Sequence, residues 1–296
     1  MKKHSNHIRE SAGMKVFHVA DNLWMIFLCA CTFLPFWLVI ASAFSSEHSI
    51  VMHGYSLWPK EFSLEAFQYV LGRGTIGKAY LVTMTVTLIG TLLAVTITTM
   101  IAYAISRPYL RYRNVISFII YFTMLFSGGL VPWYITVVRL GLKNTIWAMI
   151  LPMCFSAWNM FLMRNFFAGI PNELVESAKI DGAGEFRTFL SIILPISKPG
   201  IATITLFYML GFWNDWWLAM NFIDDRNLYP LQYLLRQVMS NVKYASEVGA
   251  IMTNTAIPTD TVQMATCLLS IGPIILAYPF LQKYFIKGIT VGAVKG

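Results

Sequence analysis

The sequence predicts an all-α polytopic membrane protein in which six transmembrane helices carry one cytoplasmic loop of two short helices. Of the 296 residues, 57% are hydrophobic and 12% are charged, whereas soluble domains carry about 25% charged residues. Six stretches with almost no charge reach the roughly 20 residues that a helix needs to cross a bilayer. They lie between Asp21 and Glu47, Lys78 and Arg107, Arg113 and Arg139, Lys143 and Arg164, Lys198 and Asp224, and Asp260 and Lys283.

These stretches divide the chain into consecutive segments. The first stretch is too long, and begins too far from the N-terminus, for a cleaved signal peptide, so we expect a retained helix. The segments that we expect are a cytoplasmic N-terminal tail at 1–20, a first transmembrane helix at 21–46, an extracytoplasmic segment at 47–78, a transmembrane domain at 79–284 that includes the loop at 171–199, and a cytoplasmic C-terminal tail at 285–296.

The second, third and fourth spans carry residues that predict how the helices pack and where they bend. The second span is rich in Thr, which lets membrane helices approach closely and bond to one another, so packing inside a bundle is favoured over lining a pore. Ser127-Gly128-Gly129 and Pro132 interrupt the third span and Pro152 the fourth, which predicts kinks. No internal repeat is evident, which argues against the secondary transporters built from inverted repeats.

The orientation follows from the basic residues in the loops. With the N-terminus inside, 14 of the 22 Lys and Arg residues lie in the tails, in the Arg107–Arg113 turn and between Arg164 and Lys198. This bias predicts that both termini and the two-helix loop are cytoplasmic. The net charge of +8 therefore reflects topology, and we expect contact with membrane lipid and no nucleic-acid partner.

The sequence lacks the motifs of an enzyme. It has no G-x-x-x-x-G-K-[ST] phosphate loop, no H-E-x-x-H motif and no Cys/His ligand spacing. We therefore expect no catalytic residue, no metal and no cofactor on this chain. Uphill transport would need energy from another subunit or from an ion gradient.

The loop at 171–199 has the pattern of two helices joined by a tight turn. Glu173, Glu176 and Lys179 fall on one side of the first helix, and Leu174, Ala178 and Ile180 are expected to form its apolar side. Asp181-Gly182 is expected to end this helix, since glycine adopts backbone angles that other residues resist. The second helix should place Phe186, Phe189, Leu190 and Ile193 on one face and close at Pro195. Such a loop is a docking element with a mechanical role.

Span five carries a second unusual cluster, Trp213-Asn214-Asp215-Trp216. With a span starting near Gly200, Asp215 would lie about 22 Å along the helix. A carboxylate inside a membrane faces the bundle interior or a watery cavity by default, and indole rings with amide and carboxylate groups suit a sugar. The alternative is an aromatic belt at the membrane surface, with Asp215 reaching water.

The loop resembles the EAA loop of binding-protein-dependent ABC importer permeases. The resemblance rests on Glu176-Ser177-Ala178-x-x-Asp181-Gly182-Ala183 followed by Leu194-Pro195; Ser177 stands where the pattern prefers Ala. The C-terminal run from Tyr278 to Gly296 is similar to the second permease of maltose-type carbohydrate importers. Phe126-Ser-Gly-Gly-Leu-Val-Pro and Met163-Arg-Asn-Phe-Phe resemble a branch that handles oligosaccharides and uronate-containing glycans.

The resemblance implies a type I ABC importer permease, a non-catalytic subunit in the bacterial cytoplasmic (inner) membrane. Its partners would be a homologous second permease, two ATPase subunits that bind ATP and Mg, an extracytoplasmic solute-binding protein and a carbohydrate. The ATPase would be contacted by two sets of residues, Glu176, Ser177, Ala178, Asp181, Gly182, Ala183, Leu194 and Pro195 in the loop, and Lys287, Gly292, Lys295 and Gly296 in the tail.

Two alternatives to an ABC permease remain at this point. A gradient-driven secondary carrier would use Asp215 as its proton or cation site. A membrane scaffold or assembly factor would need no substrate path. Neither alternative requires a cytoplasmic two-helix loop, so the loop favours the permease.

Overall fold

The computed structural model describes residues 12–72, 76–252, 259–272 and 275. The described chain is helical and forms no β-strand, apart from a single antiparallel bridge between Ser45 and Phe62. It divides into two compact units, Met1–Gly72 with Val242–Leu269, and Arg73–Asn241 with Ser270–Gly296. The predicted all-α class is thus confirmed for the described residues.

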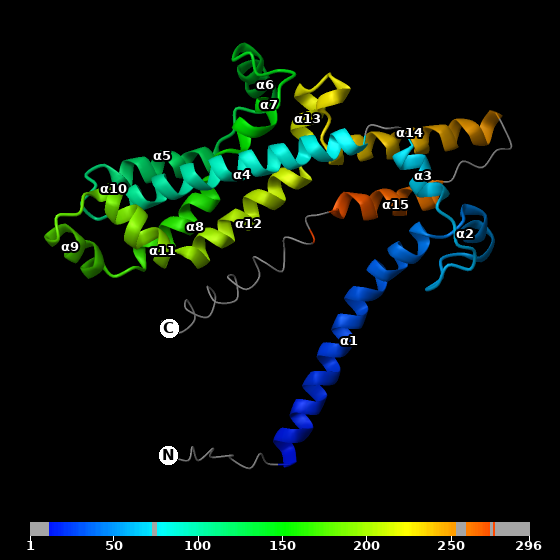
Figure 1. Cartoon of the computed structure of the whole chain (residues 1–296), viewed down its shortest axis with the longest axis horizontal. Coiled ribbons are helices and arrows are strands. Elements are labelled where there is room, and N and C mark those ends of the chain that lie inside the picture. Colours follow the sequence, from blue (N-terminus) through cyan, green and yellow to red (C-terminus); the bar gives the residue numbers. More distant parts are fainter. Residues whose placement is uncertain (1–11, 73–75, 253–258, 273–274, 276–296) are drawn as a thin grey trace. The chain divides into compact units, whose positions relative to one another are not determined.

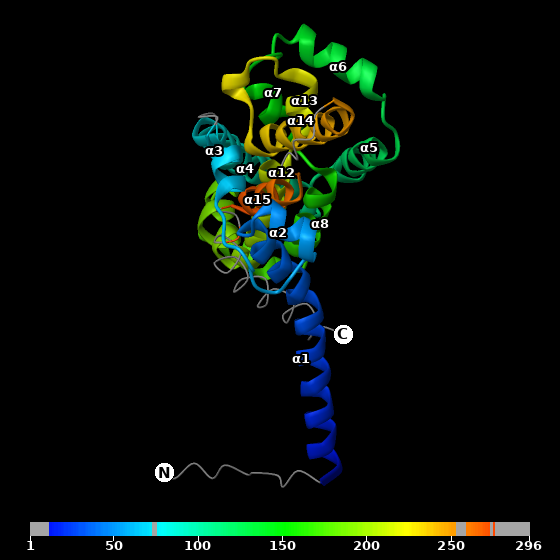
Figure 2. The same ribbon diagram turned by 90° about the vertical axis from the view of Figure 1, so that its right-hand side faces the viewer.

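The first unit begins with the long helix α1 (Ala12–Ala43), an unbroken ribbon in Figure 2. Its large apolar side chains are exposed, for example Trp24 (59%), Phe27 (56%) and Phe33 (58%). The exposed and mostly apolar surface of residues 23–35 is suited to contact with lipid. The unit continues with α2 (Glu47–His53) and α3 (Glu65–Leu71).

A glutamate ties α2 to α15 (Thr259–Ile271) within the first unit. One carboxylate oxygen of Glu47 accepts the backbone N–H groups of Thr259 and Asp260, both at 3.0 Å. The other oxygen accepts the backbone N–H of Thr261 at 2.9 Å and its hydroxyl at 2.6 Å. The first N–H groups of a helix have no partner within the helix, so Glu47 both satisfies them and places a negative charge at the positive end of α15.

The second unit is built around α4 (Ile76–Ser106), along which α8 (Ala157–Ala168) and α12 (Lys198–Asn214) pack (Figure 1). Small and hydroxyl side chains permit this approach. A Cβ atom on Gly90 would lie 2.6 Å from the ring of Phe212 on α12. Thr98 of α4 shares a hydrogen bond of 2.6 Å with the hydroxyl of Tyr208. The interior Thr residues of α4, Thr83, Thr87, Thr91, Thr98 and Thr99, are buried, in agreement with the packing interpretation.

The predicted interruptions of spans three and four are confirmed. Helices α5 (Arg113–Leu125) and α6 (Leu130–Arg139) meet at 114°, and Figure 2 shows α6 turned away from α5. Between them Gly129 adopts φ +81°, a conformation that favours glycine. In span four, α7 (Trp147–Ile150) gives way to the 3₁₀ turn η1 (Leu151–Met153), which contains Pro152, before α8 begins.

The loop between α8 and α12 comprises α9 (Asn172–Ile180), α10 (Glu185–Thr188), a π-helical turn η2 (Phe189–Ile193) and α11 (Leu194–Ile196). The second helix was expected to close at Pro195, but it runs one residue further, and the chain then bends by 83° into α12. After α12 the unit continues through α13 (Trp217–Phe222), η3 (Arg226–Leu228) and the first part of α14 (Leu231–Met252).

Two helices of the described chain are long and apolar enough to cross a membrane unbroken, α1 from Gly13 and α4. The two bent pairs, α5 with α6 and the α10–α11 segment with α12, would each add a span if counted as one. The number of six spans therefore stays a prediction. The sixth predicted span, between Asp260 and Lys283, runs beyond the described part of α15.

Candidate functional site

The two-helix loop turns at Gly182 through a defined hydrogen-bonded motif. The N–H of Gly182 donates to the carbonyl of Lys179 at 3.0 Å, and the N–H of Ala183 donates to the carbonyl of Ala178 at 2.9 Å. This is the Schellman arrangement of a helix C-terminus, in which the residue after the cap is left-handed. Gly182 has φ +78°, and a Cβ atom added to it would meet nothing within 4 Å. The turn thus requires glycine for its backbone angle and not for its small size.

The two faces of α9 are partly as predicted. Glu173, Glu176 and Lys179 are all exposed, as expected for the polar side. The expected apolar side is wrong, because Leu174 is 41% exposed and Ile180 is 87% exposed. Val175 and Ala178, three residues apart, are the buried pair. A helix buries only the stripe that its neighbours cover, and here that stripe runs through Val175.

The second helix of the loop also divides its apolar residues. Phe189 and Ile193 are buried, while Phe186 (63%) and Leu190 (45%) are exposed, so the predicted single face is wrong. Phe189 and Ile193 belong to the π-helical turn, whose wider winding shifts the register relative to an α-helix. Four large apolar side chains of the loop, Leu174, Ile180, Phe186 and Leu190, are thereby left in the open.

The residues expected to contact an ATPase take several positions. Glu176, Ser177, Asp181 and Pro195 are exposed, Ala183 and Leu194 are half-buried, and Ala178 is buried. The hydroxyl of Ser177 donates to the carbonyl of Glu173 at 2.8 Å, so it closes on its own helix. The tail residues Lys287, Gly292, Lys295 and Gly296 lie outside the described residues.

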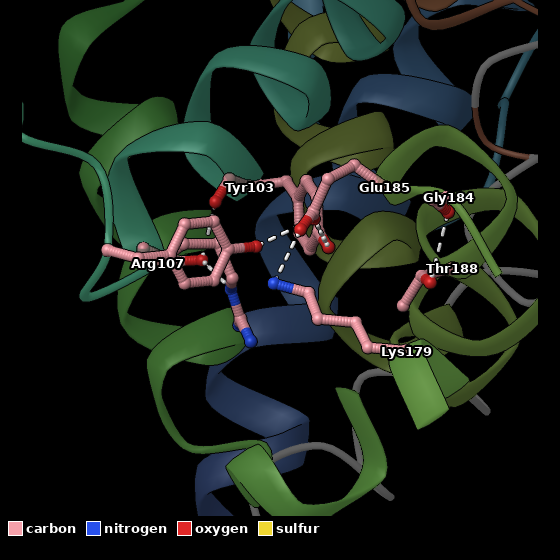
Figure 3. Close-up of polar contacts among 8 residues, drawn as sticks. Tyr103, Arg107, Lys179, Gly184, Glu185 and Thr188 are labelled. Atoms are coloured by element: carbon pink, nitrogen blue, oxygen red, sulfur yellow. Dashed lines mark hydrogen bonds and ion pairs between the residues drawn. The ribbon is translucent and has the colours of Figure 1, made fainter. Parts of the chain in front are cut away.

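A polar cluster that the sequence did not reveal holds the loop to α4 (Figure 3). One carboxylate oxygen of Glu185 accepts the hydroxyls of Tyr103 at 3.0 Å and Tyr109 at 2.6 Å. The other oxygen lies 2.7 Å from the ammonium of Lys179. The partners come from α4, the turn after α4, and α9. No local pattern links positions 76 and 82 residues apart, so single-sequence reasoning had no signal for this cluster.

The electrostatics of the cluster favour the charged carboxylate. Partial burial acts to raise the pKa of Glu185, but the hydrogen bonds from Lys179, Tyr109 and Tyr103 outweigh it and lower that pKa below its ordinary value. For Tyr109, burial followed by the hydrogen bond to Glu185 raises the pKa of the phenol. Glu185 is therefore an anion and Tyr109 a neutral donor at neutral pH.

The residues of the cluster in span five have different surroundings and partners. Helix α12 ends at Asn214 and Asp215 has an extended backbone, so the assumption that Asp215 continues the helix is wrong. Trp213 is buried and its indole N–H donates to the carbonyl of Ser270 at 3.1 Å, while the side chain of Asn214 is exposed and bonds back to Leu210 at 2.9 Å.

The next two residues of the cluster have separate partners. One oxygen of Asp215 accepts the N–H of Leu218 at 3.5 Å at the start of α13. Its other oxygen is buried and has no hydrogen-bond partner among the described residues. The guanidinium of Arg236 stands 3.7 Å from the centroid of the Trp216 ring. The sequence did not single out Arg236. Asn214 and Arg236 are exposed and Trp216 is half-buried, so these three side chains have surface that a ligand can reach.

Comparison with known proteins decides the family. Residues 94–291 match the model of the family described as "Binding-protein-dependent transport system inner membrane component". The chain belongs to this family. The resemblance inferred from the loop and the C-terminal run is thus confirmed, and the chain is an inner-membrane component of a transport system.

Relatives match along nearly the whole chain. Protein LplC of Bacillus subtilis (strain 168) is 40% identical over 282 residues, covering 95% of this chain and 96% of the relative. A polygalacturonan/rhamnogalacturonan transport system permease protein, YtcP, of the same organism is 40% identical over 273 residues, covering 92% and 95%. The crystal structure of a bacterial ABC transporter involved in the import of the acidic polysaccharide alginate has a chain with a TM-score of 0.80 and 28% identity, covering 93% of this chain and 99% of that one.

Proposed function

We propose that this chain is a non-catalytic permease subunit of an ATP-driven, binding-protein-dependent importer, and that it forms half of a pathway for an oligosaccharide. The observation that carries the proposal is the match along almost the entire chain to a permease named for polygalacturonan/rhamnogalacturonan transport and to a chain of a transporter involved in alginate import. Polygalacturonan is a polymer of a sugar acid and alginate is called acidic, so we extend the proposal to acidic oligosaccharides.

The complex would contain four kinds of protein. Beside this chain we place a homologous second permease, two ATPase subunits and an extracytoplasmic solute-binding protein. ATP and Mg would be bound by the ATPases, because this sequence has no phosphate loop. The basic residues in the loops support cytoplasmic termini and a cytoplasmic α9–α11 loop.

The loop would couple ATP hydrolysis to transport by inserting into a groove of one ATPase. Its exposed apolar side chains, Leu174, Ile180, Phe186 and Leu190, are what such a groove would cover. Glu176, Ser177 and Asp181 would contact the ATPase from the same loop, while Ala178, Gly182 and Ala183 would keep the turn in shape. Leu194 and Pro195 would act at the bend into α12, and Lys287, Gly292, Lys295 and Gly296 would reach the ATPase from the tail.

The substrate path would pass the junction of α12 and α13. Trp213 would support the junction from its buried position, and Asp215 would cap α13. Asn214 and Trp216 would meet the sugar together with Arg236. A guanidinium is a planar donor fork that matches a carboxylate, which suits a sugar acid. We therefore expect Arg236→Gln to reduce uptake of an acidic oligosaccharide more than uptake of a neutral one.

The proposal is tested by reconstituting the complex in proteoliposomes that contain ATP. We expect uptake of labelled oligogalacturonide to require both ATP and the binding protein, and to persist when an ionophore dissipates ion gradients. Uptake that follows an imposed gradient without ATP, and that Asp215→Asn abolishes, would contradict the permease and support the secondary carrier.

A further inference from the structure

We propose that Glu185 is a positioning residue that ties the α9–α11 loop to α4, so that movement of the loop is passed to the transmembrane helices. The inference rests on the proposed function, in that it assumes that an ATPase moves this loop. It adds a polar contact through which the movement leaves the loop, beside the packing of Phe189 on Tyr103.

The carboxylate of Glu185 is the meeting point of three segments. Tyr103 reaches it from the last turns of α4, Tyr109 from the turn after α4, and Lys179 from α9. Lys179 and Glu185 lie on opposite sides of the Gly182 turn, so their ion pair closes the loop on itself. Hydrogen bonds to a charged acceptor are shorter and stronger than neutral ones. The contact at 2.6 Å from Tyr109 is of this kind.

Tyr109 makes contacts through its hydroxyl and through the face of its ring. The ammonium of Lys179 stands 3.8 Å from the centroid of the Tyr109 ring, a cation–π distance, while it also pairs with Glu185. A displacement of α9 would therefore be transmitted to the turn after α4 through two contacts of Lys179, one with the Tyr109 ring and one with Glu185, which binds the Tyr109 hydroxyl. These three side chains form one connected group.

Tyr103 connects Glu185 to the core of the second unit. It is 8% exposed, and its ring packs on Phe189 at 4.9 Å and edge-on to Phe167 at 6.0 Å between centroids. Behind it lies Arg107, 2% exposed, whose guanidinium is 5.1 Å from the Tyr103 ring and donates to the carbonyl of Phe167 at 2.9 Å. The hydroxyl of Tyr103 thus contacts Glu185, and its ring contacts both the loop, at Phe189, and α8, at Phe167.

The surroundings leave space on one side of this group. A hollow of about 320 Å³ is lined by Met100, Tyr103, Leu110, Glu185 and Phe186, among others. Phe189 also lines this hollow, and Phe167 packs edge-on to the Tyr103 ring. A contact made of side chains, with room beside it, can shift with the loop and keep its hydrogen bonds, whereas tightly packed contacts would have to break.

The test uses the whole complex and compares Glu185→Gln and Tyr109→Phe with a matched control, Tyr112→Phe. Tyr112 lies in the same turn, is 58% exposed, and keeps its ring contact with Arg111 in the variant. The readouts are co-purification of the ATPases, ATP hydrolysis, and substrate imported per ATP hydrolysed. The last quantity separates transmission of movement from folding and assembly.

We expect Glu185→Gln to retain the ATPases and to lower import per ATP by about tenfold, the scale of one hydrogen bond to a charged group. Tyr109→Phe should lower it less, and Tyr112→Phe should match the native chain. The double variant Glu185→Gln/Tyr109→Phe should be no worse than Glu185→Gln alone, because both remove the same contact.

Two results would overturn the inference. One is unchanged import per ATP in an assembled Glu185→Gln complex, and the other is loss of the ATPases from that complex, which would make Glu185 a docking residue. If the native chain and Tyr112→Phe themselves show no ATP-dependent import, it is the proposed function that fails.

Discussion

Glu47 and Glu185 each join segments that are far apart in the sequence, but they do so with different kinds of donor. Glu47, in the first unit, accepts three consecutive backbone N–H groups at the start of α15. Glu185, in the second unit, accepts side-chain groups from α4, from the turn after α4 and from α9. The two carboxylates are chemically identical, so the difference lies in what they hold.

The two sets of contacts differ in how much movement they allow: those of Glu47 fix one geometry, and those of Glu185 can move. The N–H groups in the first turn of a helix cannot move independently, so Glu47 fixes one geometry. Hydroxyl and ammonium groups on rotatable side chains can change direction together while their bonds persist. We infer that Glu47 stabilises the first unit and that Glu185 transmits movement from the loop to α4.

The largest effect should come from Glu47→Ala, which leaves three N–H groups of α15 without their acceptor. We expect a loss of about 3 kcal/mol in local stability, within the range for hydrogen bonds to a charged group. Hydrogen exchange of the amides at 259–261 should accelerate by roughly a hundredfold, since 1.36 kcal/mol is a factor of ten. Glu65→Ala, on the exposed side of α3, is the control. Unchanged exchange in Glu47→Ala would contradict a stabilising role for Glu47 at the start of α15.

A smaller effect should follow from Gly182→Val, which disturbs the turn that brings Lys179 close to Glu185. The left-handed angle of Gly182 costs a β-branched residue about 1–3 kcal/mol. Asn tolerates this angle, so Gly182→Asn should retain most of the import per ATP that Gly182→Val loses. Gly184→Ala, at a position with φ −70° and open space, should be neutral. Equal losses in Val and Asn variants would mean that size matters and not the angle.

The smallest effect concerns pH. Because the pKa of Glu185 is lowered in the folded protein, its contribution is present above its unfolded value, near 4.5, and is lost only as the pH falls through the lower folded value. Import per ATP should therefore keep its Glu185-dependent part between about pH 8 and 6. The difference between the native chain and Glu185→Gln should be the same at both ends of this range. A difference that vanishes by pH 6 would show that the carboxylate is not held as described.

The sequence predicted the parts of the fold that leave local patterns. Charge-free stretches indicated the apolar helices, Gly128-Gly129 and Pro152 the breaks, and Asp181-Gly182 the turn of the loop. It failed where burial depends on neighbours that are distant in sequence. Leu174 and Ile180 are as apolar as Val175, and only the packing of α9 decides which of them is covered. The end of α12 at Asn214 was missed for a similar reason, since hydrophobicity continues through Trp216 and Trp217.

The candidate site divides in the same way. The turn residues Ala178, Gly182 and Ala183 follow from a short motif, and their backbone geometry follows from the left-handed angle of one glycine. Glu185 and Arg236 did not stand out, because a charged residue in a loop is normally solvated. Their importance comes from partners such as Tyr103 and Trp216, which only the folded chain brings near.

The central claim is that the contacts of Glu185 persist while the loop moves, so that the end of α4 follows the loop, and a distance between spin labels tests it most directly. Labels at Asn172→Cys and Tyr112→Cys, in a chain whose four native cysteines are replaced, report the separation of α9 from the turn after α4. In the assembled complex we predict one narrow distance that is the same with and without ATP, and a broad or ATP-dependent distance after Glu185→Gln. A distance that changes with ATP equally in both chains would contradict the account.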